Sequence, residues 1–190
     1  VAVHLLRELL GRIDRPNMAL ILAGGRGTRL LPTTSSLPKP MVLVAGRPIL
    51  ERLVNHTSGF GISRIALSVG HLGDVIEDHF GDGSQFGCEI TYLWEDPENP
   101  LGTGGPLGSL SKLFPELSAP VLVINGDLVT QFDVAAMLDH HEQAGAVATV
   151  GAFPYTHEVP YGVLQVNDVG HIESIVEKPL RQELVSGGIY

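Results

Sequence analysis

Short apolar runs rich in Val and Ile alternate along the chain with segments whose apolar residues recur at helical spacing. This alternation predicts strand–helix–strand units, which assemble into a mostly parallel sheet with helices on both faces. Five strands are expected, at 18–23, 64–69, 89–93, 121–124 and 146–152. Four helices are expected between them, at 49–58, 74–80, 106–114 and 134–143.

The pattern changes after Tyr161. Residues 162–166 and 171–176 flank the polar segment 167–170, an arrangement typical of a hairpin. Residues 187–190 have the pattern of a final strand. We therefore expect an α/β fold with a Rossmann-like, mostly parallel sheet and a mixed, partly antiparallel C-terminal portion.

The 190 residues correspond to one domain, because domains usually contain about 100–200 residues. Residues 1–16 precede the first strand and carry a short amphipathic pattern at 3–10. We interpret 1–16 as a linker or helix remnant of an upstream region and 17–190 as the domain proper.

Charge and composition argue against several classes of partner. The net charge is −9, whereas proteins that bind nucleic acid are usually basic. The longest uninterrupted apolar run, 18–23, is far shorter than the roughly 20 residues that cross a bilayer, so we expect no membrane association. Cys88 is the only cysteine, which excludes an internal disulfide and fits a cytoplasmic location.

The first strand leads into a glycine-rich loop, Leu22-Ala23-Gly24-Gly25-Arg26-Gly27-Thr28-Arg29. In a parallel sheet, ligands bind at the carboxyl ends of the strands. Closely spaced glycines let backbone N–H groups approach phosphate oxygens, and Arg29 and Lys39 add positive charge. The plainer alternative is a glycine turn beside two surface cations.

Asp127 follows the strand expected at 121–124, within Asn-Gly-Asp. Its carboxylate would lie at the same sheet edge as the glycine loop, where it could hold Mg²⁺ that bridges phosphate oxygens. Asn-Gly-Asp is also a common turn sequence, so a purely structural aspartate is the alternative.

The series G-x-G-T-R-L-x-P-x-T at 25–34, followed by P-K-P at 38–40, resembles the signature of the sugar-1-phosphate nucleotidyltransferases. Further motifs of that family occur in the right order: L-G-T-G-G-P-L at 101–107, N-G-D at 125–127, P-Y-G-V at 160–163, E-K-P at 177–179 and V-S-G-G-I-Y at 185–190. The chain is most similar to the mannose-1-phosphate guanylyltransferase branch, which includes relatives that act on heptose 1-phosphate.

The resemblance implies Mg²⁺-dependent transfer of a nucleotidyl group from a nucleoside triphosphate to a sugar 1-phosphate, with release of pyrophosphate. GTP and mannose or heptose 1-phosphate are favoured as substrates. It implies catalytic roles for Arg29, Lys39, Asp127 and Lys178, with Asp127 as the metal ligand. It implies nucleotide binding by Leu22, Ala23, Gly24, Gly25, Gly27, Thr28, Arg29, Gly102 and Thr103. It implies sugar-phosphate binding by Gly162, Glu177, Lys178 and Ser186.

Some of these residues have plainer explanations. Thr103 could cap the following helix, and Glu177 with Lys178 could be a surface ion pair. The family often has Asn where Ser186 stands, and its second metal-binding Asp lies beyond Tyr190. Residues 1–16 resemble the linker of members that carry an upstream regulatory module, often a pair of CBS domains.

Three other functions are compatible with the sequence. The chain could be a catalytically inactive regulatory paralogue that binds a nucleotide sugar, a nucleotidyltransferase acting on a non-sugar phosphate, or a binding or oligomerisation module without chemistry. The nucleobase, the sugar and the formation of a homo-oligomer are left open by the sequence.

Overall fold

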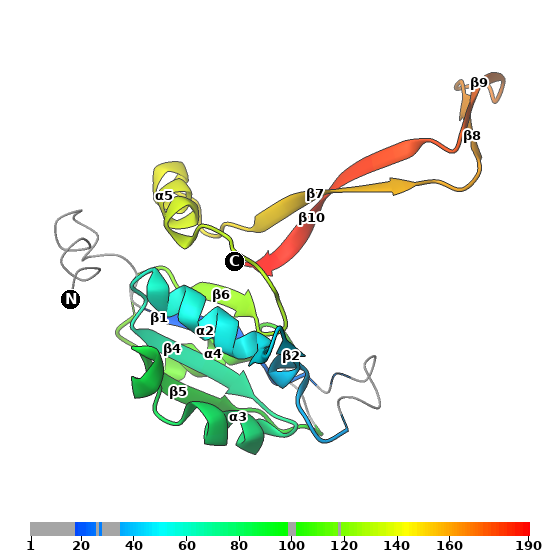
Figure 1. Cartoon of the computed structure of the whole chain (residues 1–190). Helices are drawn as coiled ribbons and strands as arrows, with labels where there is room; N and C mark the ends of the chain where they lie inside the picture. The colour runs from blue at the N-terminus through cyan, green and yellow to red at the C-terminus, as the bar shows by residue number, and fades with distance from the viewer. Residues whose placement is uncertain (1–17, 26, 28–34, 99–101, 118) are drawn as a thin grey trace. The chain divides into compact units, whose positions relative to one another are not determined.

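The computed structural model describes residues 18–25, 27, 35–98, 102–117 and 119–190 (Figure 1). Two compact units make up the chain. The first unit extends to Thr149 and also includes Tyr190, and the second unit is Val150–Ile189. The amphipathic segment expected at 3–10 lies outside the described residues.

A parallel sheet forms the centre of the first unit. Its strands are β1 (Met18–Leu22), β4 (Arg64–Val69), β5 (Glu89–Trp94) and β6 (Leu122–Asn125), in the spatial order β5-β4-β1-β6. All three neighbouring pairs are parallel. Four of the five expected strands are therefore confirmed, with ends that differ by at most one residue from the expected ones.

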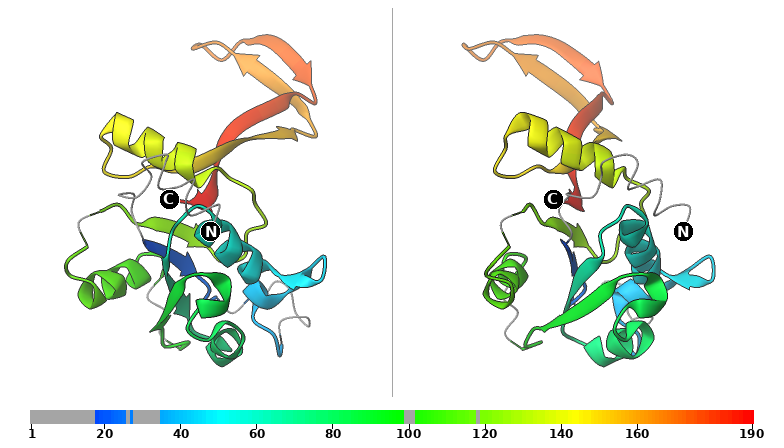
Figure 2. Two further views of the ribbon diagram at one scale, coloured as in Figure 1. Left: turned by 60° about the vertical axis from the view of Figure 1, so that its left-hand side comes forward. Right: turned by 90° about the vertical axis from the view of Figure 1, so that its left-hand side faces the viewer.

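Helices cover both faces of this sheet, as the alternating pattern predicts. They are α2 (Ile49–Gly59), α3 (Gly73–Phe80) and α4 (Gly105–Leu113); a further helix, α5 (Val134–Ala144), follows β6 along the chain. Figure 2 shows α4 on one side of the sheet and α2 and α3 on the other. Gly81 and Gly145 end α3 and α5 with φ values of +53° and +56°, a conformation that glycine adopts without steric cost.

β1 lies between two strands and beneath helices on both faces, so nearly all of its side chains are buried. Met18 and Leu20 pack with Leu110 of α4, together with Ala66, Leu93 and Val123. Ala19 and Ile21 alternate with them along the strand and are also fully buried. This two-sided burial explains why the β1 sequence is continuously apolar rather than alternating.

A short 3₁₀-helix and a small hairpin lie between the glycine loop and α2. The 3₁₀-helix is η2 (Lys39–Met41), and the hairpin consists of β2 (Leu43–Val44) and β3 (Arg47–Pro48). A second 3₁₀-helix, η3 (Ser84–Phe86), follows α3. The β2–β3 turn places Ala45 and Gly46 at φ +48° and +78°. Two successive residues with positive φ are what a two-residue hairpin turn requires.

The second unit is antiparallel throughout, which confirms the expectation of a partly antiparallel C-terminal portion. β7 (Gly151–Glu158) pairs with β10 (Leu180–Ile189), and β8 (Gly162–Val166) pairs with β9 (Ile172–Glu177). The strand expected at 146–152 is wrong in position, because β7 begins only at Gly151. The side chains of Val147 and Val150 are 103% and 51% exposed, so these two valines gain little from burial that would stabilise a strand here.

Among the helices of the described residues, none combines the length and apolar character needed to cross a membrane.

Candidate functional site

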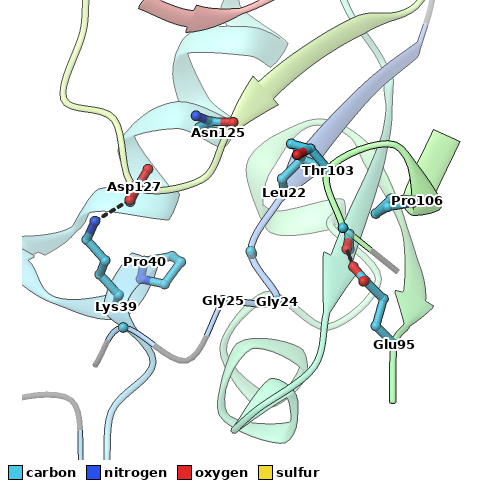
Figure 3. Close-up of a pocket in the computed structure, with 14 residues that line it drawn as sticks. Leu22, Gly24, Gly25, Lys39, Pro40, Glu95, Thr103, Pro106, Asn125 and Asp127 are labelled. Atoms are coloured by element: carbon cyan, nitrogen blue, oxygen red, sulfur yellow. Dashed lines mark hydrogen bonds and ion pairs between the residues drawn. The ribbon is translucent and has the colours of Figure 1, made fainter. Parts of the chain in front are cut away.

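A cavity of about 460 Å³ opens at the carboxyl ends of the parallel strands (Figure 3). Its wall combines strand-terminal residues, the turns that follow them, η2 and the start of α4. The lining residues are Leu22, Ala23, Gly24, Gly25, Gly27, Lys39, Pro40, Ser68, Glu95, Gly102, Thr103, Pro106, Asn125 and Asp127.

The order of the strands explains where this cavity forms. From β1 the chain adds β4 and then β5 on one side, and it returns to place β6 on the other side of β1. The turns after β1 and β6 therefore leave the sheet in opposite directions, which opens a crevice between them. The glycine loop that follows β1 lies at this reversal point, where ligands bind in open α/β sheets.

Backbone hydrogen bonds fix the start of the glycine loop from both sides. The N–H of Ala23 donates to the carbonyl of Ser68 at 2.8 Å, and the carbonyl of Leu22 accepts from the N–H of Gly126 at 2.8 Å. Gly24 and Gly25, which come next, both line the cavity. Thr28 and Arg29, predicted to bind nucleotide, lie outside the described residues.

Lys39 and Asp127 meet at one end of the cavity, although they are 88 residues apart in the sequence. The Lys39 ammonium donates to the Asp127 carboxylate in a direct ion pair. The two side chains are 37% and 33% exposed, so both remain accessible from the cavity. The structure thus brings together two of the four residues predicted to be catalytic.

Two prolines position the backbone of Lys39. Pro38 precedes η2, and Pro40 is its second residue and is buried together with Met41. The N–H of Met41 donates to the carbonyl of Pro38 at 2.8 Å, which closes the turn. Because the ring of each proline restricts φ, the Lys39 backbone is held while its long side chain stays free to rotate.

Glu95 lies at the opposite end of the cavity from this ion pair, beside Thr103 and Pro106 (Figure 3). Its carboxylate accepts a hydrogen bond from the buried hydroxyl of Ser68. The sequence-based assignment did not include Glu95 or Ser68. Its position in the sequence is the signal that indicates a site residue: Glu95 comes directly after β5, and Asp127 comes two residues after β6, so both lie at the carboxyl ends of parallel strands.

The alternative role of Thr103 as a helix cap is wrong. The N-cap residue of α4 is Gly104, and no side chain caps this helix. Gly102 and Thr103 instead line the cavity, as predicted for nucleotide-binding residues.

The sequence predicts that Asp127 binds a metal ion, and the surroundings of this carboxylate can be compared with known kinds of metal site. The described residues contain no group of three or more His, Cys, Asp and Glu side chains that could enclose an ion. Mg²⁺ commonly binds through one or two carboxylates while substrate phosphates and water supply the remaining ligands. The Asp127 carboxylate, at the end of the cavity opposite Glu95, therefore fits a cation that binds together with a phosphate compound.

The second unit brings together three of the residues predicted to bind the sugar phosphate. Gly162 of β8 pairs with Glu177 of β9, and a Cβ on Gly162 would lie 2.9 Å from a carboxylate oxygen of Glu177. Lys178 donates its backbone N–H to the carbonyl of Tyr161 at 3.2 Å and has φ +45°, which is unusual for a residue with a long side chain.

Ser186, the fourth predicted sugar-binding residue, lies elsewhere in the second unit. It is six residues along β10 from Leu180, a strand length of roughly 20 Å. There it pairs with Ala152, and its hydroxyl accepts from the N–H of Gly188 at 3.3 Å. The structure therefore does not group Ser186 with Gly162 and Glu177.

Comparison with known proteins places these features in context. Residues 18–190 match the model of the nucleotidyl transferase family. The chain is 33% identical over 177 residues to a UTP–glucose-1-phosphate uridylyltransferase of Synechocystis, covering 88% of this chain and 46% of the relative. It is 35% identical over 160 residues to a mannose-1-phosphate guanylyltransferase of Mycobacterium tuberculosis, covering 84% and 44% respectively.

Solved structures agree with this similarity. HddC from Yersinia pseudotuberculosis superposes with a TM-score of 0.64 at 30% identity, covering 92% of this chain and 75% of that chain. A putative glucose-1-phosphate thymidylyltransferase from Bacillus anthracis has a TM-score of 0.63 at 27% identity, covering 90% and 70%. The chain spans slightly less than half the length of the curated relatives described above.

Proposed function

The chain belongs to the nucleotidyl transferase family, and on that premise we propose that it transfers a nucleotidyl group from a nucleoside triphosphate to a sugar 1-phosphate. The observation that carries this proposal is the meeting of Lys39 and Asp127 beside the glycine loop, in one cavity. The relatives named above for uridylyl and guanylyl transfer to hexose 1-phosphates support the same class of substrate.

In the proposed reaction, an oxygen of the sugar phosphate attacks the α-phosphorus of the triphosphate. A new P–O bond forms, the bond from the α-phosphorus to the bridging oxygen breaks, and pyrophosphate leaves with that electron pair. The attacking oxygen is already anionic at neutral pH, so no general base is needed. The difficulty is to bring two polyanions together, and catalysis therefore depends on positioning and charge stabilisation.

The residues of this chain would divide that task between them. Backbone N–H groups of the glycine loop would hold the triphosphate, and Lys39 would neutralise charge near the α-phosphate. Asp127 would hold the divalent cation, for which we propose Mg²⁺, and the cation would supply further neutralisation of phosphate charge. Arg29 and Thr28 are proposed to extend the triphosphate site, and Lys178, Glu177 and Gly162 to bind the sugar phosphate; Ser186, which pairs with Ala152 elsewhere on β10, is left out of this proposal.

We further propose that the base binds at the Glu95 end of the cavity and that guanine is preferred. A carboxylate only accepts hydrogen bonds. Guanine offers two adjacent donors on one edge, the ring N1–H and the 2-amino group, whereas uracil offers one donor between two acceptors. The guanylyltransferase relative and the structure of HddC complexed with GMP-PN support the same choice. For the sugar, mannose or heptose 1-phosphate is proposed on the sequence resemblance.

Pyrophosphate release tests this function. The protein would be assayed with GTP, UTP, dTTP and CTP, each with a panel of sugar 1-phosphates and Mg²⁺. We expect release only when both substrates are present, fastest with GTP. Asp127→Asn should abolish most of the rate, while Lys112→Ala, at an exposed position on α4, serves as the control. Binding of nucleotide sugar without any pyrophosphate release would instead favour the inactive regulatory paralogue.

A further inference from the structure

The ion pair of Lys39 and Asp127 joins two side chains that the proposed reaction needs for different partners. Lys39 is assigned to phosphate and Asp127 to the divalent cation, yet without ligands each satisfies the other. A carboxylate oxygen that accepts from an ammonium group is occupied, and the ammonium also repels a cation that approaches the same carboxylate. The following inference rests on the proposed function of this cavity.

We propose that Lys39 is an internal counter-ion that competes with the divalent cation for Asp127, and that the triphosphate ends this competition by drawing Lys39 onto its own oxygens. The cation and the nucleotide then bind cooperatively. The cation alone binds weakly, because it must displace Lys39 and leave that ammonium without a partner.

Three features of the site support such an exchange. First, the backbone of Lys39 is held by the turn between Pro38 and Met41, so only the side chain has to move. Second, a lysine side chain is a flexible stem with a compact charge at its end, and it can change partner by rotation alone. Third, both Lys39 and Asp127 line the same cavity as the glycine loop, so a bound triphosphate would lie within reach of the ammonium.

A permanent structural ion pair is the competing explanation. Both side chains are about one-third exposed. Ion pairs between exposed groups contribute little to the stability of folded proteins. The fold around the pair is instead maintained by the buried apolar cluster that includes Met18 and Leu20 of β1, and by backbone hydrogen bonds at the strand ends. The pair is thus free to separate at small cost.

The exchange has a measurable consequence for metal affinity. If Lys39 competes for Asp127, removing the ammonium should tighten binding of the cation in the absence of nucleotide. By thermodynamic linkage, the factor by which the nucleotide increases the affinity for the cation equals the factor by which the cation increases the affinity for the nucleotide. Removing the Lys39 ammonium should reduce this coupling factor, whichever of the two ligands is titrated.

Mn²⁺ serves as the probe, because its free concentration can be followed by electron paramagnetic resonance. Binding would be titrated for the wild type, Lys39→Met and Lys39→Arg, each with and without the α,β-methylene analogue of GTP. Without nucleotide, we expect Lys39→Met to bind Mn²⁺ about fivefold to tenfold more tightly than the wild type, the effect of removing one nearby partly screened charge. Lys39→Arg keeps the charge and should show no tightening.

Two further variants make the result specific. Asp127→Asn should lose the site in every background, and Lys112→Met, which removes a lysine charge elsewhere on the surface, should leave Mn²⁺ affinity unchanged. Thermal unfolding of each variant verifies that it is folded. Equal Mn²⁺ affinity of the wild type and Lys39→Met without nucleotide would overturn the inference.

The outcome also separates this inference from the proposed function. If the wild type binds neither the GTP analogue nor Mn²⁺ in the presence of the analogue, the proposed function is wrong and the inference falls with it. If the wild type binds both ligands cooperatively but Lys39→Met has the same coupling factor as the wild type, only the counter-ion role of Lys39 is wrong.

Discussion

Gly126 lies directly against the carbonyl oxygen of Leu22. Its N–H donates to that oxygen at 2.8 Å, and a Cβ built on Gly126 would come within 2.7 Å of the same atom. This approach joins the turn after β6 to the start of the glycine loop after β1. The glycine of Asn-Gly-Asp is therefore required by the contact between two walls of the cavity.

Gly126→Ala should destabilise the protein by about 1–3 kcal/mol, because the added methyl group meets backbone that cannot rotate away. Gly108→Ala is the matched control. Gly108 is in α4, and a Cβ there would have no neighbour within 4 Å. That substitution should stabilise the protein by about 0.5–1 kcal/mol through helix propensity. Urea denaturation of both variants checks the pair, and equal effects would show that the contact with Leu22 is unimportant.

Lys39→Ala should lower kcat by about 10²–10³-fold, the scale of losing one preorganised electrostatic group. Arg29→Ala is expected to have an effect of similar size. Steady-state pyrophosphate release measures both, with Lys112→Ala as the control for loss of a lysine charge elsewhere. A loss below tenfold for either variant would exclude the catalytic role assigned to that residue.

Glu95→Gln should weaken the preference for GTP over UTP by about 10–100-fold in kcat/KM, equivalent to the 1–3 kcal/mol of discrimination that a bidentate contact to a base provides. The amide retains the size of the side chain but replaces one acceptor by a donor, which faces a donor of guanine. Glu116→Gln, at an exposed position, is the matched control. An unchanged GTP-to-UTP ratio would remove Glu95 from base recognition.

Burial raises the pKa of the Cys88 thiol from 9.0 to about 11. The folded state therefore holds this proton more tightly than the unfolded state, and the free energy of unfolding should fall as pH rises from about 9 to 11. Cys88→Ala should show a shallower fall over this range; Tyr92, whose pKa is raised from 10.0 to about 12, also lowers stability at high pH but is present in both proteins. Denaturation at several pH values measures the difference.

The same shift predicts slow modification of Cys88 by a thiol reagent at pH 8, since the reactive thiolate is scarce and the side chain is buried. Unfolding in urea should accelerate the reaction strongly. Rapid labelling of the folded protein would contradict the buried position of Cys88.

Much of the first unit is predictable from the sequence because its signals are local. The strand at 64–69 and the helices beginning at Ile49 and Val134 lie where the apolar pattern puts them. The parallel sheet follows from the alternation of these elements. The same reasoning places the glycine loop and Asp127 at one sheet edge, and their common cavity confirms this expectation.

The second unit is harder to predict from the sequence, because its long strands lack a continuous apolar pattern. β7 contains Pro154 and polar residues such as Thr156, and its side chains are largely exposed. A proline lowers the expectation of a strand, although an edge strand tolerates it. Conversely, the apolar segment near Val147 resembles a strand, but its valine side chains are exposed. Glu95 is hard to predict for another reason: its carboxylate is positioned by the hydroxyl of Ser68, which is distant in sequence.

The wall of the cavity is built from strand-terminal residues and turns, whereas the interiors of the strands supply the apolar layers beneath it. The residues that would select the substrate and the residues that stabilise the fold are thus largely different ones. A wall side chain that does not pack into these layers, such as exposed Thr103, can be exchanged during evolution without disturbing the packing below. This separation accounts for one scaffold recurring in relatives whose names specify uridylyl, guanylyl and thymidylyl transfer.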